Sequence, residues 1–273
     1  MNIAEYQNLT EYLYQKTGIK FEDAKYDFVR RRVEERIKNL GLKSFREYFL
    51  YLKYGDKGDE FQLLINALTI NETYFFREYP QLKCFAEEVI PEIIKKKTVK
   101  HLKIWSAGCS TGEEPYTLAI ILKEMLEGTG FTFQVDATDI NSRVIEYARK
   151  RLYTRRSVKD VPEVYLEKYF RPRGEVFELT VEIAKYVNFQ ILNLLDEKEM
   201  NKMAGYDAIF CRNVLIYFDD KSRREVALQF YRALNPGGFI FLGHSESMSR
   251  ITSVFRLKKY NNAIIYQKPE VGI

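Results

Sequence analysis

From residue 101 onward, short apolar segments alternate with amphipathic ones. HLKIWSAG (101–108) precedes EEPYTLAIILKEMLEG (113–128), and FTFQVDATDI (131–140) precedes NSRVIEYARKRLY (141–153). Further apolar segments occur at YDAIFC, FIFLGHS and AIIYQK. This strand–helix alternation predicts right-handed βαβ units and therefore a mostly parallel, doubly wound α/β sheet. The last pair of segments, VFRLKKY and NAIIYQK, is predicted to form an antiparallel hairpin at one edge.

The first part of the chain has a different pattern. Apolar residues recur every three to four positions, glycines interrupt the pattern, and no alternating strand pattern is present. We therefore predict an N-terminal helical domain with its linker over residues 1–95 and a sheet domain over 96–273. Residues 153–190 break the strand–helix alternation, and RPRGEVFELTVEI within them predicts a small β-insertion on one edge of the sheet.

Composition narrows the classes of protein that fit. The chain has only three cysteines, Cys84, Cys109 and Cys211, and two histidines, His101 and His244, which argues against a disulfide framework and a metal centre. No apolar segment approaches the ~20 residues of a membrane span, and the first residues lack a secretory signal pattern. A net charge of +5 is too small to indicate nucleic-acid binding by itself. We expect a reduced, cytoplasmic, metal-free monomer that binds no nucleic acid.

The segment IWSAGCSTGEEPYT (104–117) joins the first predicted strand to its helix. Gly108 and Gly112 allow a ligand to approach the backbone closely, as in the first loop of nucleotide-binding sheets. The acidic pair Glu113 and Glu114 would repel a pyrophosphate, so a ligand without phosphate suits this loop better than a dinucleotide does. Two alternatives are a hydrolase nucleophile at Ser110, in a G-x-S-x-G pattern, and an ordinary strand–helix turn.

Polar residues also follow the later strands. Asp139 lies 27 residues after Gly112 and suits a ribose ligand, although it could instead cap the following helix. NLLD (193–196) and CRNVLIYFD (211–219) come at the ends of two further strands, where ligands of open α/β sheets bind. Asp136, three residues before Asp139, is expected to point away from the ligand.

Two N-terminal features each allow two interpretations. In TINETYFFRE (69–78), the residues alone favour an aromatic core with Arg77 on the surface. The helix predicted over 25–40 has six basic and three acidic residues, and it is either a solvated face or a docking face for an acidic protein helix or nucleic acid.

Taken together, these motifs resemble a known family. NETYFFRE, WSAGCSTGEEPYT, ATDIN, NLLD, CRNVLIYF and NPGGFIFLGHSES occur in the order seen in the chemotaxis receptor methyltransferases, the CheR family. The resemblance extends from about residue 20 to residue 267. It implies a Rossmann-like class I methyltransferase sheet with a small β-insertion, preceded by a small all-α domain. It also implies methyl transfer from S-adenosylmethionine to glutamates on the cytoplasmic helices of chemoreceptors. The products would be glutamyl 5-methyl esters and S-adenosylhomocysteine, with no metal involved.

The resemblance also assigns residues. Arg77 and Tyr217 are the implied catalytic residues. The implied cofactor-binding residues are Asn71, Thr73, Arg77, Gly108, Glu113, Glu114, Asp139, Asn193, Leu194, Arg212 and Asn213, with the choice between Glu113 and Glu114 left open. The basic helix is implied to dock on receptor helices through Arg30, Arg31, Arg32, Arg36 and Lys38. Some relatives bind a tethering peptide through a longer insertion loop, and the short segment here predicts that no tether is needed.

Two other functions compete with this interpretation. A methyltransferase acting on nucleic acid or a small molecule is one, but an amino-group DNA methyltransferase would show an N/D-P-P-Y/F/W motif where this chain has CRNV. The other is a protein that binds S-adenosylmethionine and docks on receptors without transferring methyl groups.

Overall fold

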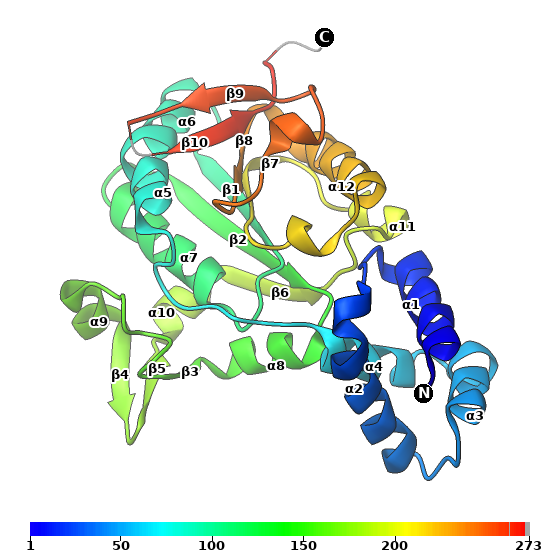
Figure 1. Cartoon of the computed structure of the whole chain (residues 1–273). Coiled ribbons are helices and arrows are strands. Elements are labelled where there is room, and N and C mark those ends of the chain that lie inside the picture. Colours follow the sequence, from blue (N-terminus) through cyan, green and yellow to red (C-terminus); the bar gives the residue numbers. More distant parts are fainter. Residues whose placement is uncertain (262, 271–273) are drawn as a thin grey trace.

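The computed structural model describes residues 1–261 and 263–270, and a seven-stranded sheet forms its centre (Figure 1). The strand order is β6-β2-β1-β7-β8-β10-β9. The first five of these strands are parallel, and β10 pairs antiparallel with both β8 and β9. The strands are β1 (His101–Ala107), β2 (Thr132–Asp139), β6 (Val187–Ile191), β7 (Tyr206–Cys211), β8 (Leu234–Leu242), β9 (Arg256–Lys259) and β10 (Ile264–Gln267). The predicted α/β class and the C-terminal hairpin are confirmed.

Helices cover both faces of this sheet, so its central strands are buried on both sides. In β7, Ala208 and Phe210 face one core cluster, whereas Ile209 and Cys211 face the other. This explains why the strand is continuously apolar rather than alternating. Figure 1 shows α7 and α12 on opposite sides of the sheet. The covering helices are α5 (Tyr79–Cys84), η3 (Phe85–Val89), α6 (Ile90–Lys96), α7 (Glu113–Leu126), α8 (Ser142–Lys150), α11 (Glu197–Met200) and α12 (Asp220–Ala233).

The N-terminal part is helical, as predicted, and has its own core. Tyr6, Leu9, Val33 and Leu64 are among the buried residues of that core. Helix α1 begins with a capping box between Asn2 and Glu5. Its elements are α1 (Ile3–Thr17), η1 (Asp23–Lys25), α2 (Tyr26–Asn39), α3 (Phe45–Leu50), η2 (Tyr51–Gly55) and α4 (Asp59–Leu68).

The insertion is smaller than the predicted range of 153–190. A three-stranded antiparallel sheet of order β3-β5-β4 comprises β3 (Leu152–Thr154), β4 (Phe170–Arg173) and β5 (Val176–Leu179). The insertion also includes α9 (Glu163–Tyr169), a helix that the sequence did not predict. Helix α10 (Val181–Ala184) follows the last strand of the small sheet. Residues Val187–Ile191 form β6, which pairs with β2 at the edge of the large sheet, so the insertion ends before them. Position 262 of the hairpin turn and residues 271–273 of the predicted sheet domain lie outside the described residues.

The helical domain is joined to the sheet domain in two places. On one side, Gln62 Nε2 donates to the Ile140 carbonyl at 2.9 Å, and Asn66 Nδ2 donates to Ser142 Oγ at 2.9 Å. On the other side, Tyr14 OH donates to Asp219 at 2.9 Å. Ile140, at the first attachment, and Phe218, next to Asp219 at the second, both line the cavity described below. Among the described residues, no helix has both the length and the apolarity to span a membrane.

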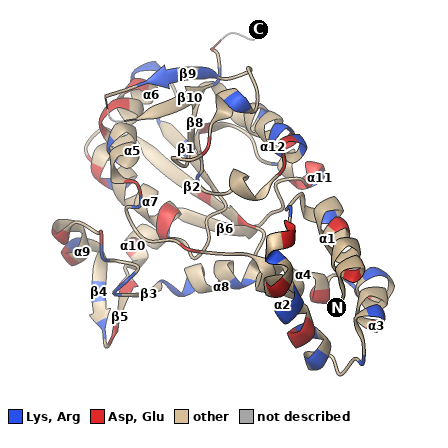
Figure 2. Ribbon diagram, viewed as in Figure 1, with Lys and Arg blue, Asp and Glu red and all other residues tan. Residues whose placement is uncertain are grey.

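The structure corrects one residue of the predicted docking helix. Arg36 makes two hydrogen bonds to Glu60, at 2.9 and 2.6 Å, and Tyr48 OH donates to the same carboxylate at 2.9 Å. Because Glu60 is buried, Arg36 is directed into the helical domain, and its assignment to receptor docking is wrong. Arg31, Arg32 and Lys38 are exposed, and Figure 2 shows α2 carrying both basic and acidic residues.

We predict that Glu60→Ala destabilises the helical domain. Arg36 and Tyr48 would keep their inward positions without an acceptor, and breaking a buried pair costs about 3 kcal/mol or more of unfolding free energy. Glu34→Ala is the matched control because Glu34 pairs with Arg30 on the exposed side of α2, and its cost should stay below about 0.5 kcal/mol. Denaturant unfolding of the full chain measures both, and equal losses would contradict the assignment.

Candidate functional site

A cavity of about 370 Å³ lies between the helical domain and the carboxyl ends of the parallel strands. Its size is within the usual range for small-molecule sites. The structure brings all the predicted site residues except Glu113 to its walls. These lining residues are Asn71, Thr73, Arg77, Gly108, Glu114, Asp139, Asn193, Leu194, Arg212, Asn213 and Tyr217.

The loop after β1 leaves no room for a side chain at Gly108. This glycine has a φ of +82°, and a Cβ built on it would lie 2.3 Å from Val214 Cγ2. The hydrolase alternative finds no support in this loop. Ser110 Oγ donates to the Asn71 carbonyl, whereas His244 is exposed and faces Glu78 at 3.1 Å. The described residues therefore contain no Ser110–His244 hydrogen bond of the kind that a nucleophile and its base require.

Asp139 is held in place by the backbone. Its carboxylate accepts the Ser110 N–H at 2.8 Å and the Asn141 N–H at 2.9 Å. Burial raises the pKa of Asp139, and these hydrogen bonds act in the opposite direction. The residue that caps α8 is Asn141, so Asp139 is not the cap. Asp136 points away from the cavity and accepts the Tyr206 hydroxyl at 2.7 Å.

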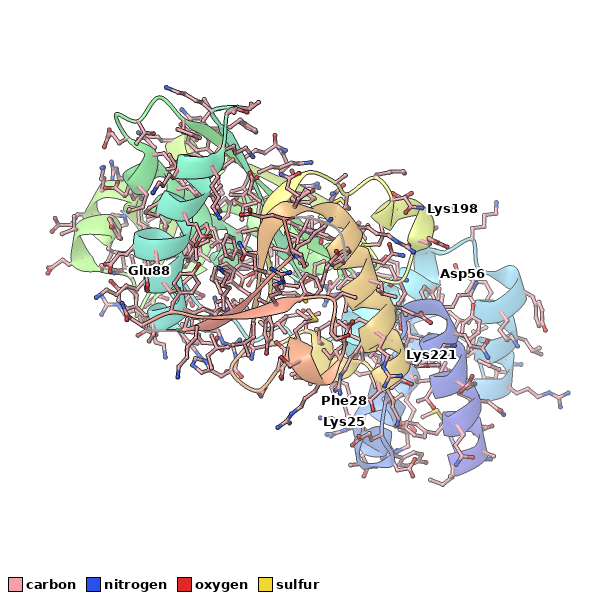
Figure 3. All side chains as sticks on the ribbon, turned by 90° about the horizontal axis from the view of Figure 1, so that it is seen from above. Lys25, Phe28, Asp56, Glu88, Lys198 and Lys221 are labelled. Atoms are coloured by element: carbon pink, nitrogen blue, oxygen red, sulfur yellow. The ribbon has the colours of Figure 1, made fainter. Side chains whose placement is uncertain are left out.

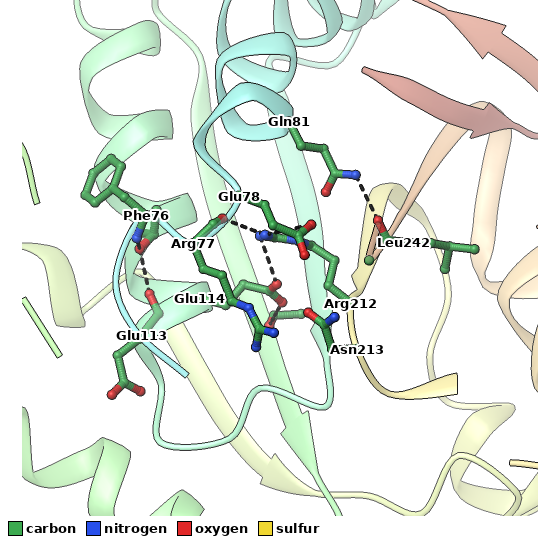
Figure 4. A network of polar contacts seen from close by, with 12 residues as sticks. Phe76, Arg77, Glu78, Gln81, Glu113, Glu114, Arg212, Asn213 and Leu242 are labelled. Atoms are coloured by element: carbon green, nitrogen blue, oxygen red, sulfur yellow. Dashed lines mark hydrogen bonds and ion pairs between the residues drawn. The ribbon is translucent and has the colours of Figure 1, made fainter. Parts of the chain in front are cut away.

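Arg212 is the centre of a buried ionic cluster, shown in Figure 4. Its guanidinium nitrogens lie 3.3 Å from Glu78 and 3.4 Å from Glu114, and one of them also donates to the Arg77 carbonyl. Burial alone would raise the pKa of Glu78, but Arg212 and His244 outweigh it, so the pKa lies below its ordinary value. Arg212 therefore pairs with two carboxylates that come from different elements.

The two glutamates of the first loop differ in position. Glu114 lines the cavity and accepts the Ser106 hydroxyl at 2.6 Å. Burial raises the pKa of Glu114, with Arg212 acting against it. Glu113 is 2% exposed and accepts the Thr111 hydroxyl at 2.6 Å. Because its side chain does not reach the cavity wall, the structure brings only Glu114 to the site, and the inclusion of Glu113 is corrected.

Arg77 and Tyr217 both line the cavity. Arg77 Nη1 donates to the Glu72 carbonyl at 3.0 Å, and its guanidinium lies 5.8 Å from the centre of the Tyr74 ring. Burial raises the pKa of the Tyr217 phenol, although the nearby charge of Arg77 opposes the shift. Tyr217 is therefore a neutral hydrogen-bond donor at ordinary pH.

Glu246 supports the site although no sequence motif assigned it a role. Its Oε2 accepts the N–H groups of Gly243 at 2.7 Å and Asn213 at 2.8 Å, and its Oε1 accepts that of Val214 at 3.1 Å. These bonds hold Asn213 in a left-handed conformation with a φ of 59°. The only sequence signal was an acidic residue directly after LGHS. Nothing in the sequence shows which backbone N–H groups would donate hydrogen bonds to its carboxylate.

The helical domain also contributes to the cavity wall, which the sequence did not reveal. Ile19, Lys20 and Phe28 line it from this side. Ile19 forms an antiparallel bridge with Phe218, and Lys20 N–H donates to the Tyr217 carbonyl at 2.9 Å. The segment after α1 therefore covers the loop that presents Tyr217. Among the described residues, no cluster of three or more His, Cys, Asp or Glu side chains could hold a metal ion.

Comparison with known proteins matches both domains to one family. The family model described as "CheR methyltransferase, SAM binding domain" matches residues 71–264, and "CheR methyltransferase, all-alpha domain" matches residues 4–69. Chemotaxis protein methyltransferase 2 of Vibrio cholerae is 45% identical, over 96% of this chain and 92% of its own. The chemotaxis protein methyltransferase of Salmonella typhimurium is 37% identical, over 93% and 88% respectively. A solved O-methyltransferase family protein from Burkholderia thailandensis has a TM-score of 0.43 at 13% identity, over 77% of this chain and 59% of that one.

We predict that Asp139→Asn weakens S-adenosylmethionine binding at least about tenfold, since a hydrogen bond to a charged acceptor contributes ~1.5–3 kcal/mol. Asp136→Asn is the control on the same strand. It should lower the melting temperature, because it disturbs the Tyr206 and Lys103 contacts, while the affinity stays within about twofold. Calorimetry and thermal unfolding separate the two effects. An unchanged affinity in Asp139→Asn would remove Asp139 from the cofactor site.

We also predict that Glu246→Gln weakens cofactor binding without a direct ligand contact. The amide retains one acceptor oxygen, so at least one of three backbone donors loses its partner, at a cost of about 1–3 kcal/mol. Glu225→Gln, exposed on α12, is the matched control and should change neither stability nor affinity. The proposed role of Glu246 fails if its variant binds the cofactor as tightly as the unmodified chain.

Proposed function

The chain belongs to the CheR methyltransferase family, and from this premise we propose that it methylates glutamate side chains of chemoreceptors with S-adenosylmethionine. The products are glutamyl 5-methyl esters and S-adenosylhomocysteine. The observation that carries the proposal is the joint presence, around one cavity, of residues that are separate in the sequence, from Asn71 to Tyr217. The relatives are chemotaxis protein methyltransferases, which supports a role in chemotaxis.

The cavity fits a cofactor that carries positive charge and no phosphate. Asp139 and Glu114 bring carboxylates to the walls. Among the described residues that line the cavity, the only buried cation is Arg212, and its charge is already neutralised by Glu78 and Glu114. Asn213 Oδ1 is buried without a hydrogen-bond partner, as an acceptor awaiting a ligand donor would be. S-adenosylmethionine has a sulfonium, an ammonium and two ribose hydroxyls, which suit these groups.

We assign each part of the cavity a task. Asp139 accepts the ribose hydroxyls, and Asn193 and Leu194 lie beside the adenine. Asn71, Thr73 and Arg77 close the opposite wall. Because the Asp139 carboxylate is fixed by two backbone N–H groups, it accepts ligand hydrogen bonds without having to reorganise.

The acceptor glutamate needs no general base. Its reference pKa is near ~4.3, so it is a carboxylate at neutral pH. When bound, S-adenosylmethionine would supply a methyl group activated by its sulfonium. Attack of a carboxylate oxygen on that methyl carbon would form the ester bond as the carbon–sulfur bond breaks, with S-adenosylhomocysteine as the leaving group. Arg77 and Tyr217 orient that carboxylate, and the cavity walls exclude water. Alignment of two reactants accounts for up to ~7–11 kcal/mol of barrier lowering.

The receptor helix docks, in this proposal, on the exposed cations of α2. Arg31, Arg32 and Lys38 are exposed and remain candidates. Arg30 also remains a candidate, although it is half-buried and pairs with Asp27 and Glu34, whereas Arg36 is excluded by its bond to Glu60. Lys25 and Phe28, at the start of α2, line the cavity, so a helix lying along α2 would pass the entrance.

We predict that the purified chain transfers radiolabelled methyl groups to chemoreceptor cytoplasmic fragments in a form that base releases. Fragments with Glu→Ala at the acceptor positions should take up no label. Label that resists base, or that persists on the Ala fragments, would exclude glutamate esterification. Between about pH 4 and 6, turnover should rise as the acceptor ionises and then level off, because no base has to titrate.

Arg77→Ala tests the assigned orienting role in the same assay. Misplacement of the carboxylate should lower turnover about 100-fold. Arg77→Lys, which keeps the charge but not the planar fork, should recover part of the rate. Unchanged turnover and unchanged cofactor binding in Arg77→Ala would remove Arg77 from the active site.

A further inference from the structure

The segment RKRLYTRRSVK (149–159) contains six basic residues and no acidic one. We propose that its three outward cations, Arg155, Arg156 and Lys159, bind acidic side chains of the acceptor protein on the side of the entrance opposite α2. We call these three residues the insertion rim. This inference rests on the proposed function and deepens it, because it specifies how the acceptor protein is recognised.

Backbone and side-chain contacts hold the insertion rim against the cavity loops. The Ser157 carbonyl accepts the Phe75 N–H at 2.9 Å, and Tyr153 OH donates to the Thr111 carbonyl at 2.9 Å. Val158, between the rim residues, is buried. The rim therefore has a fixed position relative to the loops that line the cavity.

Two rim residues touch side chains of the cavity wall itself. Arg156 lies 2.8 Å from Glu72, and the Lys159 ammonium lies 4.6 Å from the centre of the Tyr74 ring. Glu72 and Tyr74 both line the cavity. The rim cations consequently stand at the entrance and not on a remote surface.

The helical domain forms the other side of this entrance. Lys20, Lys25 and Phe28 line the cavity from there, and Figure 3 labels Lys25 and Phe28 on the helical domain. Figure 2 shows further basic residues on α8 and near β3, between α2 and the small sheet. A chain that inserts a glutamate into the cavity thus passes between two groups of cations.

The rim cations are more available to a partner than Arg149 and Arg151 of the same segment. Lys159 is exposed, and its ammonium lies 3.8 Å from the exposed carboxylate of its neighbour Asp160. Arg149 donates to the Phe189 carbonyl, and Arg151 pairs with Glu178. By contrast, Arg155 is exposed, and the Arg156 and Glu72 side chains are 82% and 73% exposed in their pair. An exposed pair of this kind contributes little, so an acceptor carboxylate can replace Glu72 on Arg156.

Charge complementarity identifies the occupant as an acidic helical segment around the acceptor glutamate. Acidic residues on one side of that glutamate meet the insertion rim, and those on the other side meet the cations of α2. Opposite charges of this kind improve encounter rate and fix orientation. The insertion rim therefore fixes which end of the acceptor segment points toward the small sheet.

The test compares two charge-reversal variants of the full chain loaded with S-adenosylhomocysteine. Arg155→Glu/Arg156→Glu reverses the rim, and Arg256→Glu/Lys259→Glu makes the same charge change on the exposed edge strand β9. Figure 1 shows β9 and β3 at opposite ends of the molecule. The probes are labelled helical peptides of about 20 residues with a central glutamate. In one peptide, further glutamates lie only on the N-terminal side of the central glutamate, and in the other only on its C-terminal side. Glutamine takes the corresponding positions on the uncharged side.

The rim variant should bind one of the two peptides roughly tenfold more weakly, while its affinity for the other stays within about twofold of that of the unmodified chain. The β9 variant should bind both peptides with affinities within about twofold of those of the unmodified chain. The loss of affinity in the rim variant should become smaller as the salt concentration rises from about 0.02 to 0.15 M. Equal weakening of both peptides, or of neither, overturns the inference. Methyl transfer to the peptides by the unmodified chain is measured in parallel. Absence of methyl transfer would count against the proposed function, whereas the binding data would still test whether the insertion rim binds acidic side chains.

Discussion

The buried guanidinium of Arg212 is the interaction on which the geometry of the site depends. A cation removed from water is costly unless carboxylates surround it, and here Glu78 and Glu114 lie on either side of it. These partners come from the connection before α5 and from the first turn of α7, whereas Arg212 follows β7. Neutralising one charge therefore draws three separate segments together. The Arg77 carbonyl, which accepts from Arg212, places Arg77 at the same junction.

The sheet alone would leave the site open, and the helical domain covers it. Ile19 pairs with Phe218, and Lys20 donates to the Tyr217 carbonyl, so the chain after α1 holds the loop that carries a proposed catalytic residue. Gly18, with a φ of 69°, allows the sharp turn that brings this segment over. Cofactor binding and attachment of the helical domain should consequently be linked, because a ligand that contacts both stabilises their association.

Much of this arrangement follows from the order of the sequence motifs. Parallel strands end at one edge, so Gly108, Asp139 and Arg212, each at the carboxyl end of a strand, had to meet there. Other features depend on tertiary partners that a sequence pattern does not reveal. A helical wheel places Arg36 with Arg32 on the stripe next to the apolar face of this helix, but it cannot show that Glu60 from α4 draws Arg36 inward. The short VNFQI segment looked like part of the insertion until its pairing with β2 made it a sheet edge.

Arginine side chains perform different tasks in this protein, depending on how deeply each is buried and how many hydrogen-bond acceptors surround it. Arg36 and Arg212 are largely withdrawn from solvent and paired with carboxylates, so the positive charge of each is already balanced within the protein. Arg77 is only partly buried, and the one hydrogen bond that its guanidinium makes within the described chain is to a neutral carbonyl. A guanidinium has five N–H donors in a planar fork. Arg77 can therefore orient an incoming carboxylate, a task for which Arg212 is no longer suited.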